Sequence, residues 1–452
     1  MNARETRQRA LEELLNQGGF NVLAPPVVEA AVRHCEDTVR TGDVDAALDL
    51  ASRIVGRRDA LSAEQELRLH AARATALAIG WKYIQALELV KLVRKEMAEA
   101  LRAAPEPADR LTVLEGMCLY MLNQAEDSLR TLMELRSRLL KGPDTAVLAF
   151  CTNQLSAVYA SDGKFELAAQ MALDAVVSAR RSGDEYVIGQ TLTNYSQIQK
   201  RACRWAEARA AGEEALSIQE ALGARHQVNH IMRSLALLRW KRGELSAALD
   251  MWAQCAASAK DLSNVVLASF TDLTKALILI HLGQFEEAQS ICRNVPGWEV
   301  LHGGSKAALL AAEYLGEIEL ERGRAASALR LFEELRTRTV AVSPRGDLTA
   351  ELNRRLAECH YLLARHDAAY SASIEGVELC RRTGDRYEEA ATYRILALSA
   401  AAIGKPDEAK KWFDVGFAFY EDIQTPYEWG KLWMAYGDWL LGPNAGVHAG
   451  AN

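Results

Sequence analysis

A short pattern recurs along the chain about every 40 residues. It consists of a Gly, an apolar residue or Pro two positions later and an Ala five positions later, as in 163–168, 243–248, 283–288, 323–328 and 404–409. We place the turns at Gly42, Gly80, Asn123, Gly163, Cys203, Gly243, Gly283, Gly323, Ala364 and Gly404, which lie 38 to 43 residues apart. A fixed period of this length is typical of repeat proteins. The 452 residues therefore predict one extended array of repeats instead of three separate globular domains.

Each repeat is expected to form a helical hairpin. The segments before and after each turn, such as 155–159 and 248–252, carry apolar residues at helical spacing. The residue seven positions before the turn is small in eight consecutive copies: Gly116, Ser156, Ser196, Ala236, Ala276, Gly316, Ala357 and Ala397. Small residues there, and the Ala after the turn, allow two antiparallel helices to approach closely. All ten prolines can be placed in loops or first helical turns, and no strand-like alternation competes.

The predicted fold is all-α, with about ten hairpins between residues 25 and 441. We expect residues 1–24 to hold one helix and a Gly-Gly break, and residues 442–452 to form a flexible tail or linker. The last repeat of an array needs a cap because it has no neighbour. Ten of the 31 aromatic residues lie between 412 and 439, which predicts an aromatic capping helix at 426–441. The alternative is a docking face for a second subunit or a following domain, formed by Trp429, Trp433, Tyr436 and Trp439.

Composition narrows the possible partners. The formal net charge is −7 and no basic block occurs, so nucleic acid is not expected as a direct partner. No run of 18 uncharged apolar residues is present and the N-terminus does not resemble a signal peptide, which predicts a cytoplasmic protein that does not bind membranes. The eight cysteines show no paired spacing, and we interpret them as reduced, small apolar residues.

The sequence contains no recognisable catalytic motif. Phosphate-binding Gly-rich loops, H-E-x-x-H, G-x-S-x-G and calcium loops are all missing from the sequence. His226 and His230 are four residues apart on a predicted helix, but no third metal ligand lies nearby in the sequence. We therefore predict a protein that is not an enzyme and has neither a metal site nor a cofactor.

The repeat resembles the tetratricopeptide repeat. In that family the first helix carries L-G-x-x-Y before a turn Gly, and the second helix carries Ala five residues later; Leu155, Ser156, Tyr159, Gly163 and Ala168 match this motif almost completely. The resemblance covers about 26–441 and implies a right-handed superhelical solenoid. The period of 40 instead of 34 is most similar to the superhelical sensor regions of bacterial transcriptional regulators and to kinesin light chain repeats.

The resemblance also implies a concave groove lined by the first helix of each hairpin. The positions 13, 10, 9, 6 and 3 residues before each turn give the candidate lining Asn153, Gln190, Asn194, Gln197, His230, Arg233, Trp240, Phe270, Arg354, Tyr361 and Arg394. Amide side chains carry both a donor and an acceptor, which suits the backbone of an extended peptide. Three alternatives remain open. The amides could pair with the neighbouring repeat, the apolar positions such as Leu273 and Leu277 could belong to the core, and the arginines could be solvated or paired with Glu358.

We therefore predict a non-enzymatic binding module in a bacterial signalling or transcription-control system. Its groove would bind a peptide, a protein segment or a small effector, and its aromatic C-terminal end would contact a second copy or an effector domain. The alternative function is a constitutive scaffold or chaperone-like adaptor that binds a protein partner without a small ligand.

Overall fold

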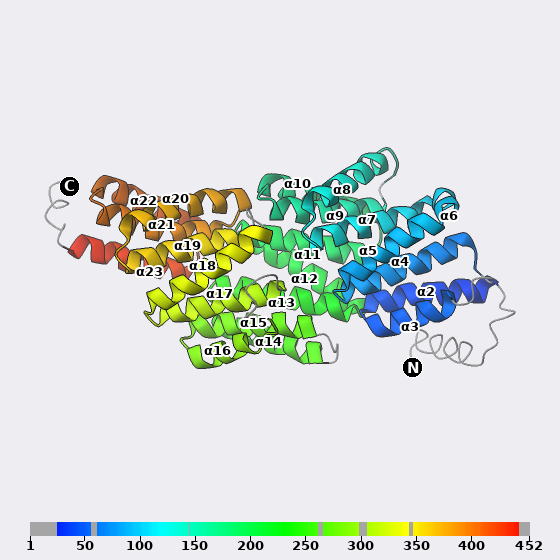
Figure 1. The fold of residues 1–452 in the computed structure, drawn as a ribbon, viewed down its shortest axis with the longest axis horizontal. Helices are drawn as coiled ribbons and strands as arrows, with labels where there is room; N and C mark the ends of the chain where they lie inside the picture. Colours follow the sequence, from blue (N-terminus) through cyan, green and yellow to red (C-terminus); the bar gives the residue numbers. More distant parts are fainter. Residues whose placement is uncertain are drawn as a thin grey trace. The chain divides into compact units, whose positions relative to one another are not determined.

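The computed structural model describes residues 25–55, 61–143, 145–260, 265–297, 305–342 and 347–442, and in these residues all regular structure is α-helical (Figure 1). The first helices are α2 (Pro25–Thr41), α3 (Val44–Val55), α4 (Ala63–Ile79), α5 (Tyr83–Glu96), α6 (Ala98–Ala103), α7 (Pro105–Met121), α8 (Ala125–Leu139), α9 (Ala146–Ser161), α10 (Phe165–Ser182), α11 (Glu185–Arg201) and α12 (Trp205–Ala221). They continue with α13 (Arg225–Lys241), α14 (Leu245–Lys260), α15 (Val265–His281), α16 (Phe285–Arg293), α17 (Lys306–Glu321), α18 (Ala325–Val342), α19 (Asp347–Leu362), α20 (His366–Thr383), α21 (Arg386–Ala402), α22 (Pro406–Ile423) and α23 (Pro426–Leu441).

The described helices follow one another as the predicted hairpins. Ten pairs flank the ten turns, the short α6 is an addition between the second and third pairs, and α23 follows the last pair as the capping helix. The predicted all-α hairpin array is thus confirmed. The segments 1–24 and 443–452, for which we predict a helix with a break and a tail, lie outside the described residues. Within the described helices, no segment combines the length and apolar character needed to cross a lipid bilayer.

Nine of the ten predicted turn residues adopt a left-handed backbone conformation. They include non-glycine residues, with φ of 62° at Asn123, 55° at Cys203 and 57° at Ala364. The second turn differs from the prediction, because Gly80 has φ of −77° and Trp81 takes the left-handed conformation at 63°. The predicted register is therefore wrong by one residue in this hairpin. With the turn at Trp81, Ala86 falls five residues later and is fully buried, like the corresponding Ala of the other hairpins.

The small residues lie where helices approach closely. Ser196 Oγ on α11 donates to the backbone carbonyl of Ala208 on α12, at 2.6 Å, and Ser128 Oγ on α8 donates to that of Gly116 on α7, at 2.7 Å. The alanines five residues after the turns are buried: Ala47, Ala168, Ala208, Ala248, Ala288, Ala328, Ala369 and Ala409. The eight cysteines are buried and free, as expected of small core residues.

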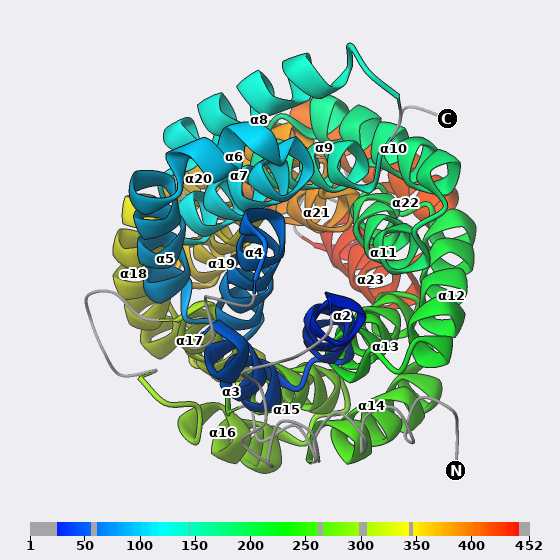
Figure 2. The ribbon, with the colours of Figure 1, turned by 90° about the vertical axis from the view of Figure 1, so that its right-hand side faces the viewer.

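The chain divides into two compact units. The first comprises Met1–Val158, Met171–Leu192 and Glu214–Val228, and the second comprises Tyr159–Gln170, Thr193–Glu213 and Asn229–Asn452. In the first unit, α2, α3 and α4 share a core that includes Val32, Ile54 and Leu69. In the second unit, α17, α18 and α19 share a core around Phe332. Figure 2 shows that, within the second unit, α15, α17, α19 and α21 lie on the inner side, and α16, α18, α20 and α22 lie on the outer side.

In the second unit, residues more than 100 positions apart in the sequence meet. The Trp205 indole N–H donates to the carbonyl of Ile423 at 2.5 Å. The rings of His281 and Tyr427 stack with centroids 4.0 Å apart. Two ion pairs complete these contacts, between Lys241 and Asp385 at 3.5 Å and between Lys431 and Glu321 at 2.8 Å. The C-terminal ends of α13, α15 and α17 are thereby fixed against the first residues of α21 and α23.

Candidate functional site

The residues predicted to line a groove are divided between the two units. Asn153 and Gln190 belong to the first unit. Asn153 is buried, and its side-chain oxygen has no hydrogen-bond partner among the described residues, whereas Gln190 is half-buried. The other nine predicted groove residues belong to the second unit.

One group of polar residues lies on α11, α13 and α15, and we call it the basic-amide patch. It consists of Asn194, Gln197, Lys200, His230, Arg233, Ser234 and Phe270. The Gln197 amide nitrogen lies 3.1 Å from Nε2 of His230. Lys200 Nζ donates to Ser234 Oγ at 3.1 Å, and the Arg233 guanidinium lies 4.7 Å from the centre of the Phe270 ring. The structure thus brings together four residues that the sequence predicts for one groove, namely Gln197, His230, Arg233 and Phe270.

The basic-amide patch contains two basic side chains, Lys200 and Arg233. Burial lowers the pKa of Lys200, and the neighbouring cations Lys241, Arg233 and Arg201 lower it further, to about 7, against the opposing effect of Asp385. Burial also lowers the pKa of Arg233. In the described part of the chain, neither Lys200 nor Arg233 forms an ion pair with a carboxylate. Both side chains keep partial solvent exposure, so an anion could reach them.

Two further residues of the predicted groove, Trp240 and Tyr361, lie beside other aromatic rings. Trp240 is buried, with its ring centroid 4.7 Å from that of His281 and 5.8 Å from that of Tyr387. Tyr361 is half-buried, 5.5 Å from the ring of His366. The apolar residues Leu273 and Leu277 are buried as well, so the core alternative holds for them.

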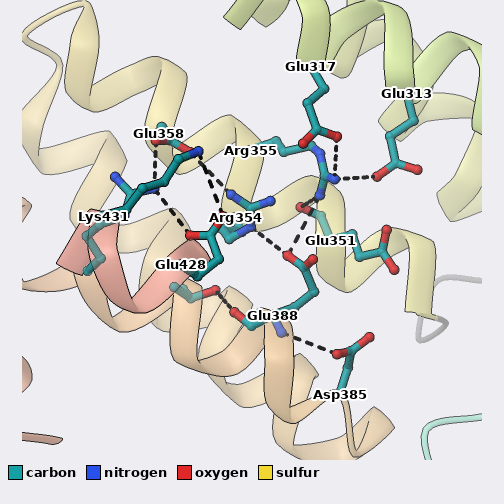
Figure 3. Close-up of polar contacts among 12 residues, drawn as sticks. Glu313, Glu317, Glu351, Arg354, Arg355, Glu358, Asp385, Glu388, Glu428 and Lys431 are labelled. Atoms are coloured by element: carbon teal, nitrogen blue, oxygen red, sulfur yellow. Dashed lines mark hydrogen bonds and ion pairs between the residues drawn. The ribbon is translucent and has the colours of Figure 1, made fainter. Parts of the chain in front are cut away.

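A second polar group connects α17, α19, α21 and α23, and we call it the buried charge network (Figure 3). It consists of Glu313, Glu317, Glu351, Arg354, Arg355, Glu358, Asp385, Glu388, Arg394, Glu428 and Lys431. Arg355 is central, because its guanidinium lies 2.9 Å from Glu317, 3.3 Å from Glu313 and 3.7 Å from Glu388.

The two predicted groove arginines, Arg354 and Arg394, belong to this network. Arg354 contacts Glu388 at 2.5 Å and Glu358 at 3.2 Å, and Arg394 contacts the same Glu358 at 2.8 Å. Both arginines are buried. Of the alternatives for these residues, pairing with Glu358 is confirmed.

Charge pairing decides which carboxyl groups of the buried charge network are ionised. Burial favours the neutral form of Glu317, but Arg355, His281 and Arg354 outweigh it and lower the pKa to about 2. Glu358 behaves in the same way, with Arg394 and Arg354 lowering its pKa to about 2. Glu313 differs because it is completely buried and shares Arg355 with other carboxylates. Burial raises the pKa of Glu313 to about 7.

We expect Glu313→Gln to remove a pH-dependent loss of stability. The folded pKa of Glu313 is above its ordinary value of 4.5, so its contribution to stability is complete below pH 4.5 and disappears as the pH rises through about 7. Between pH 6 and pH 8 the wild type should lose about 1 kcal/mol of unfolding free energy that the variant retains. Urea denaturation at both pH values measures this. Parallel pH profiles of the two proteins would contradict it.

Some members of both groups are missing from the predicted site. Glu351 and Arg355 lie 13 and 9 residues before the turn at Ala364, and Lys200 lies three residues before the turn at Cys203. These three residues therefore occupy positions that are expected to line the groove. Asp385 and Glu388 are near the start of α21, and Glu428 and Lys431 are on the capping helix, which has no following turn. No repeat position could have identified these four residues.

The aromatic C-terminal end forms the predicted cap. Phe417 of α22 contacts Trp433 and Tyr436 of α23, with ring centroids 4.2 and 5.3 Å apart. Trp439 is buried against Phe413, whereas Trp429 is half-buried and 55% of Trp433 is exposed. A docking role for Trp429, Trp433, Tyr436 and Trp439 stays a prediction.

Comparisons with known proteins agree with this architecture. A tetratricopeptide repeat family model matches residues 348–422. No curated protein sequence matches the chain. A solved structure of a Rap protein complexed with competence and sporulation factor is 13% identical over 79% of this chain and 98% of that chain, with a TM-score of 0.57. The apo form of the quorum sensor NprR from B. thuringiensis is 13% identical over 79% of this chain and 99% of that chain, with a TM-score of 0.51.

At this level of identity, the similarity to the two structures concerns the fold. The family match adds sequence evidence on α19 to α22, where the repeat period, the left-handed turn and the buried Ala positions all recur. These observations point to the same kind of repeat. Residues 348–422 match the tetratricopeptide repeat in sequence, and the other described hairpins share the same arrangement of paired helices.

Proposed function

We propose that this protein is a non-enzymatic regulatory module that binds a peptide or a protein segment at the basic-amide patch. The observation that carries the proposal is the composition of the patch. It combines amide and imidazole groups with two partly exposed cations that have no carboxylate partner in the described residues. Amides suit a peptide backbone, and the cations suit an anionic group. Two structures of similar fold, a Rap protein in complex with competence and sporulation factor and the quorum sensor NprR, support a signalling role.

The position of the patch suggests how binding is transmitted. α11, α13 and α15 are the first helices of three successive hairpins. In a repeat array, each hairpin packs mainly on its neighbours, so a ligand that contacts several of them favours one relative orientation of the hairpins. Regulation then follows when a partner recognises that orientation.

A random peptide display library tests the proposal. Peptides enriched on the wild type should bind the double variant Asn194→Ala and Arg233→Ala at least about tenfold more weakly, since each hydrogen bond to a charged group contributes about 1.5–3 kcal/mol. Circular dichroism should show unchanged helicity. Lys306→Gln with Arg382→Gln is the control, because both residues are exposed on the same unit. Equal affinity of all three proteins would exclude the patch as the binding site.

Hydrogen exchange distinguishes a regulatory module from a constitutive adaptor. A regulatory module should show changed protection beyond α11, α13 and α15 when the selected peptide binds. Changes confined to these three helices would favour the adaptor.

A further inference from the structure

The first turn of the array contacts the beginning of a hairpin four places later. Arg40 lies at the end of α2, two residues before the turn at Gly42, and pairs with Asp184 at 3.2 Å. The Arg40 guanidinium also lies 5.5 Å from the centre of the Tyr186 ring. Asp184 and Tyr186 stand at the start of α11, so residues 144 positions apart meet within the first unit. We call these three residues the first contact set.

The same arrangement recurs in the second unit as the second contact set. Lys241 lies two residues before the turn at Gly243 and pairs with Asp385 at 3.5 Å. Its Nζ lies 4.5 Å from the centre of the Tyr387 ring. Again 144 residues separate the cation from the aspartate, and every member follows its counterpart by 201 residues, or five repeats. The motif Gly-Asp-x-Tyr occurs twice in the sequence, at 183–186 and 384–387, and each copy supplies one contact set.

Each aspartate is also a helix cap. Asp184 accepts a hydrogen bond from the backbone N–H of Val187, and Asp385 accepts one from that of Glu388, both at 3.2 Å. A carboxylate in this position is stabilised by the free N–H groups and the dipole of the helix. The cap holds the carboxylate in place, so little further side-chain entropy is lost when it pairs with the cation of the earlier hairpin.

The turn glycines of the two contact sets touch a third hairpin. A Cβ atom on Gly42 would lie 2.8 Å from Cβ of His226, at the start of α13. A Cβ atom on Gly243 would lie 2.7 Å from Cγ of Pro426, at the start of α23. In both cases the helix contacted is the first helix five places later. Gly323 has a similar φ, yet a Cβ atom there would meet no atom of the described residues within 4 Å.

A third hairpin uses the same positions with different chemistry. His281 is again two residues before its turn, and its ring stacks on that of Tyr427, 146 residues later, with centroids 4.0 Å apart. Tyr427 follows the left-handed Gln424 by three residues, which is the offset between Gly and Tyr in both Gly-Asp-x-Tyr copies. Contact between a turn and the hairpin four places later is therefore a recurring property of this array.

We infer that both contact sets are lateral locks, which hold hairpins four places apart at a fixed spacing and open to let each unit extend with its hairpins intact. Neighbouring hairpins share apolar cores, such as that of α17, α18 and α19. Without a lock, the spacing of hairpins four places apart is the sum of small rotations at those cores, so it varies easily. A direct contact across that distance selects one spacing. Because each lock consists of a few groups at hairpin ends, it opens without exposing the cores.

Spin labels at Ser246→Cys and Arg382→Cys measure the spacing at the lock of the second unit. Both positions are exposed, whereas the eight native cysteines are buried and therefore unreactive. With the lock intact, pulsed electron paramagnetic resonance should give one narrow distance distribution. Adding Lys241→Gln with Asp385→Asn should produce a second, longer distance at unchanged helicity, since Asn still caps α21.

The matched control is Lys410→Gln with Asp414→Asn. These residues form an exposed ion pair at 2.9 Å within α22, so the same types of substitution remove a pair that joins no distant hairpins. The control should keep the narrow distribution. A distribution unchanged by Lys241→Gln with Asp385→Asn would overturn the inference.

Gly243→Ala tests the lock without changing a charge. Its Cβ would collide with Pro426, so we expect the same longer distance between the labels. Gly323→Ala is its control, because Ala there bears the same cost of a left-handed conformation but meets no neighbour. Equal distributions for the two Ala variants would show that lateral contact does not set the spacing, and would refute the lock.

The first unit provides an independent repetition. Labels at Asp45→Cys and Arg181→Cys occupy the same repeat positions as those of the second unit, and both sites are exposed. Arg40→Gln with Asp184→Asn should lengthen the distance between them. An effect in the second unit alone would contradict a device shared by both Gly-Asp-x-Tyr copies.

Discussion

Replacing Arg355 by Leu is expected to lower the free energy of unfolding by about 3–5 kcal/mol. Arg355 is 4% exposed and contacts Glu313, Glu317 and Glu388 at 3.3, 2.9 and 3.7 Å. Without the guanidinium these carboxylates stay buried and lose a shared counter-charge. Leu fills part of the volume, so the loss is mainly electrostatic.

Urea denaturation at pH 7 measures this effect, with Arg382→Leu as the control because Arg382 is exposed. Adding Glu313→Gln and Glu317→Gln to Arg355→Leu should restore part of the stability, since two of the unpaired carboxylates are removed. A loss below about 1 kcal/mol for Arg355→Leu would show that the buried charge network contributes little to stability. The second-unit helices would then be held together by apolar packing alone.

Replacing Gly316 by Ala is expected to destabilise the protein by about 1–3 kcal/mol, although Ala favours a helix over Gly by about 1 kcal/mol. A Cβ atom at Gly316 would lie 2.8 Å from Cζ of Phe332, a ring that is fully buried where α17 and α18 cross. The ring cannot move away without disturbing the core it shares with Leu352 and Leu356. Overpacking therefore outweighs the gain in helix propensity.

Gly430→Ala is the matched control for Gly316→Ala. Gly430 is also inside a helix, α23, but a Cβ atom there would meet nothing within 4 Å. It should raise the free energy of unfolding by about 0.5–1 kcal/mol. Thermal or urea denaturation measures both variants, and adding Phe332→Leu should partly rescue Gly316→Ala. Equal effects at the two positions would mean that α17 and α18 do not cross as closely as described.

Several structural features could be predicted because each repeat contains the information for its own hairpin. The small residues at Ser196 and Gly316 follow from the geometry of two helices that cross close to a turn. The error at Gly80 has a local cause as well. Gly is the residue expected in the left-handed conformation, yet in this turn Trp81 adopts it, with φ of 63°. Only the buried Ala86, five residues after Trp81, indicates the register of this hairpin.

The candidate site could be predicted in part. Counting fixed positions before each turn places Gln197, His230, Arg233 and Phe270 in the groove lining of neighbouring hairpins. The structure joins Gln197 with His230, and Arg233 with Phe270. The same counting could not predict that Arg233 and Arg354 have different partners. Both are arginines at equivalent offsets before their turns, yet one faces an aromatic ring and the other faces two carboxylates.

By itself, the sequence determined the paired helices, nine of the ten turns, the number of hairpins and the aromatic cap, because these depend on residues within one period of about 40. Only the tertiary structure decided which charges of the second unit are buried and paired. Contacts such as Lys241 with Asp385 and His281 with Tyr427 join segments more than 100 residues apart. They depend on the rotation that accumulates from hairpin to hairpin, and a small change in packing at each turn alters it. A single repeat does not encode this accumulated rotation. The rotation leaves Lys200 and Arg233 without a carboxylate partner in the described residues.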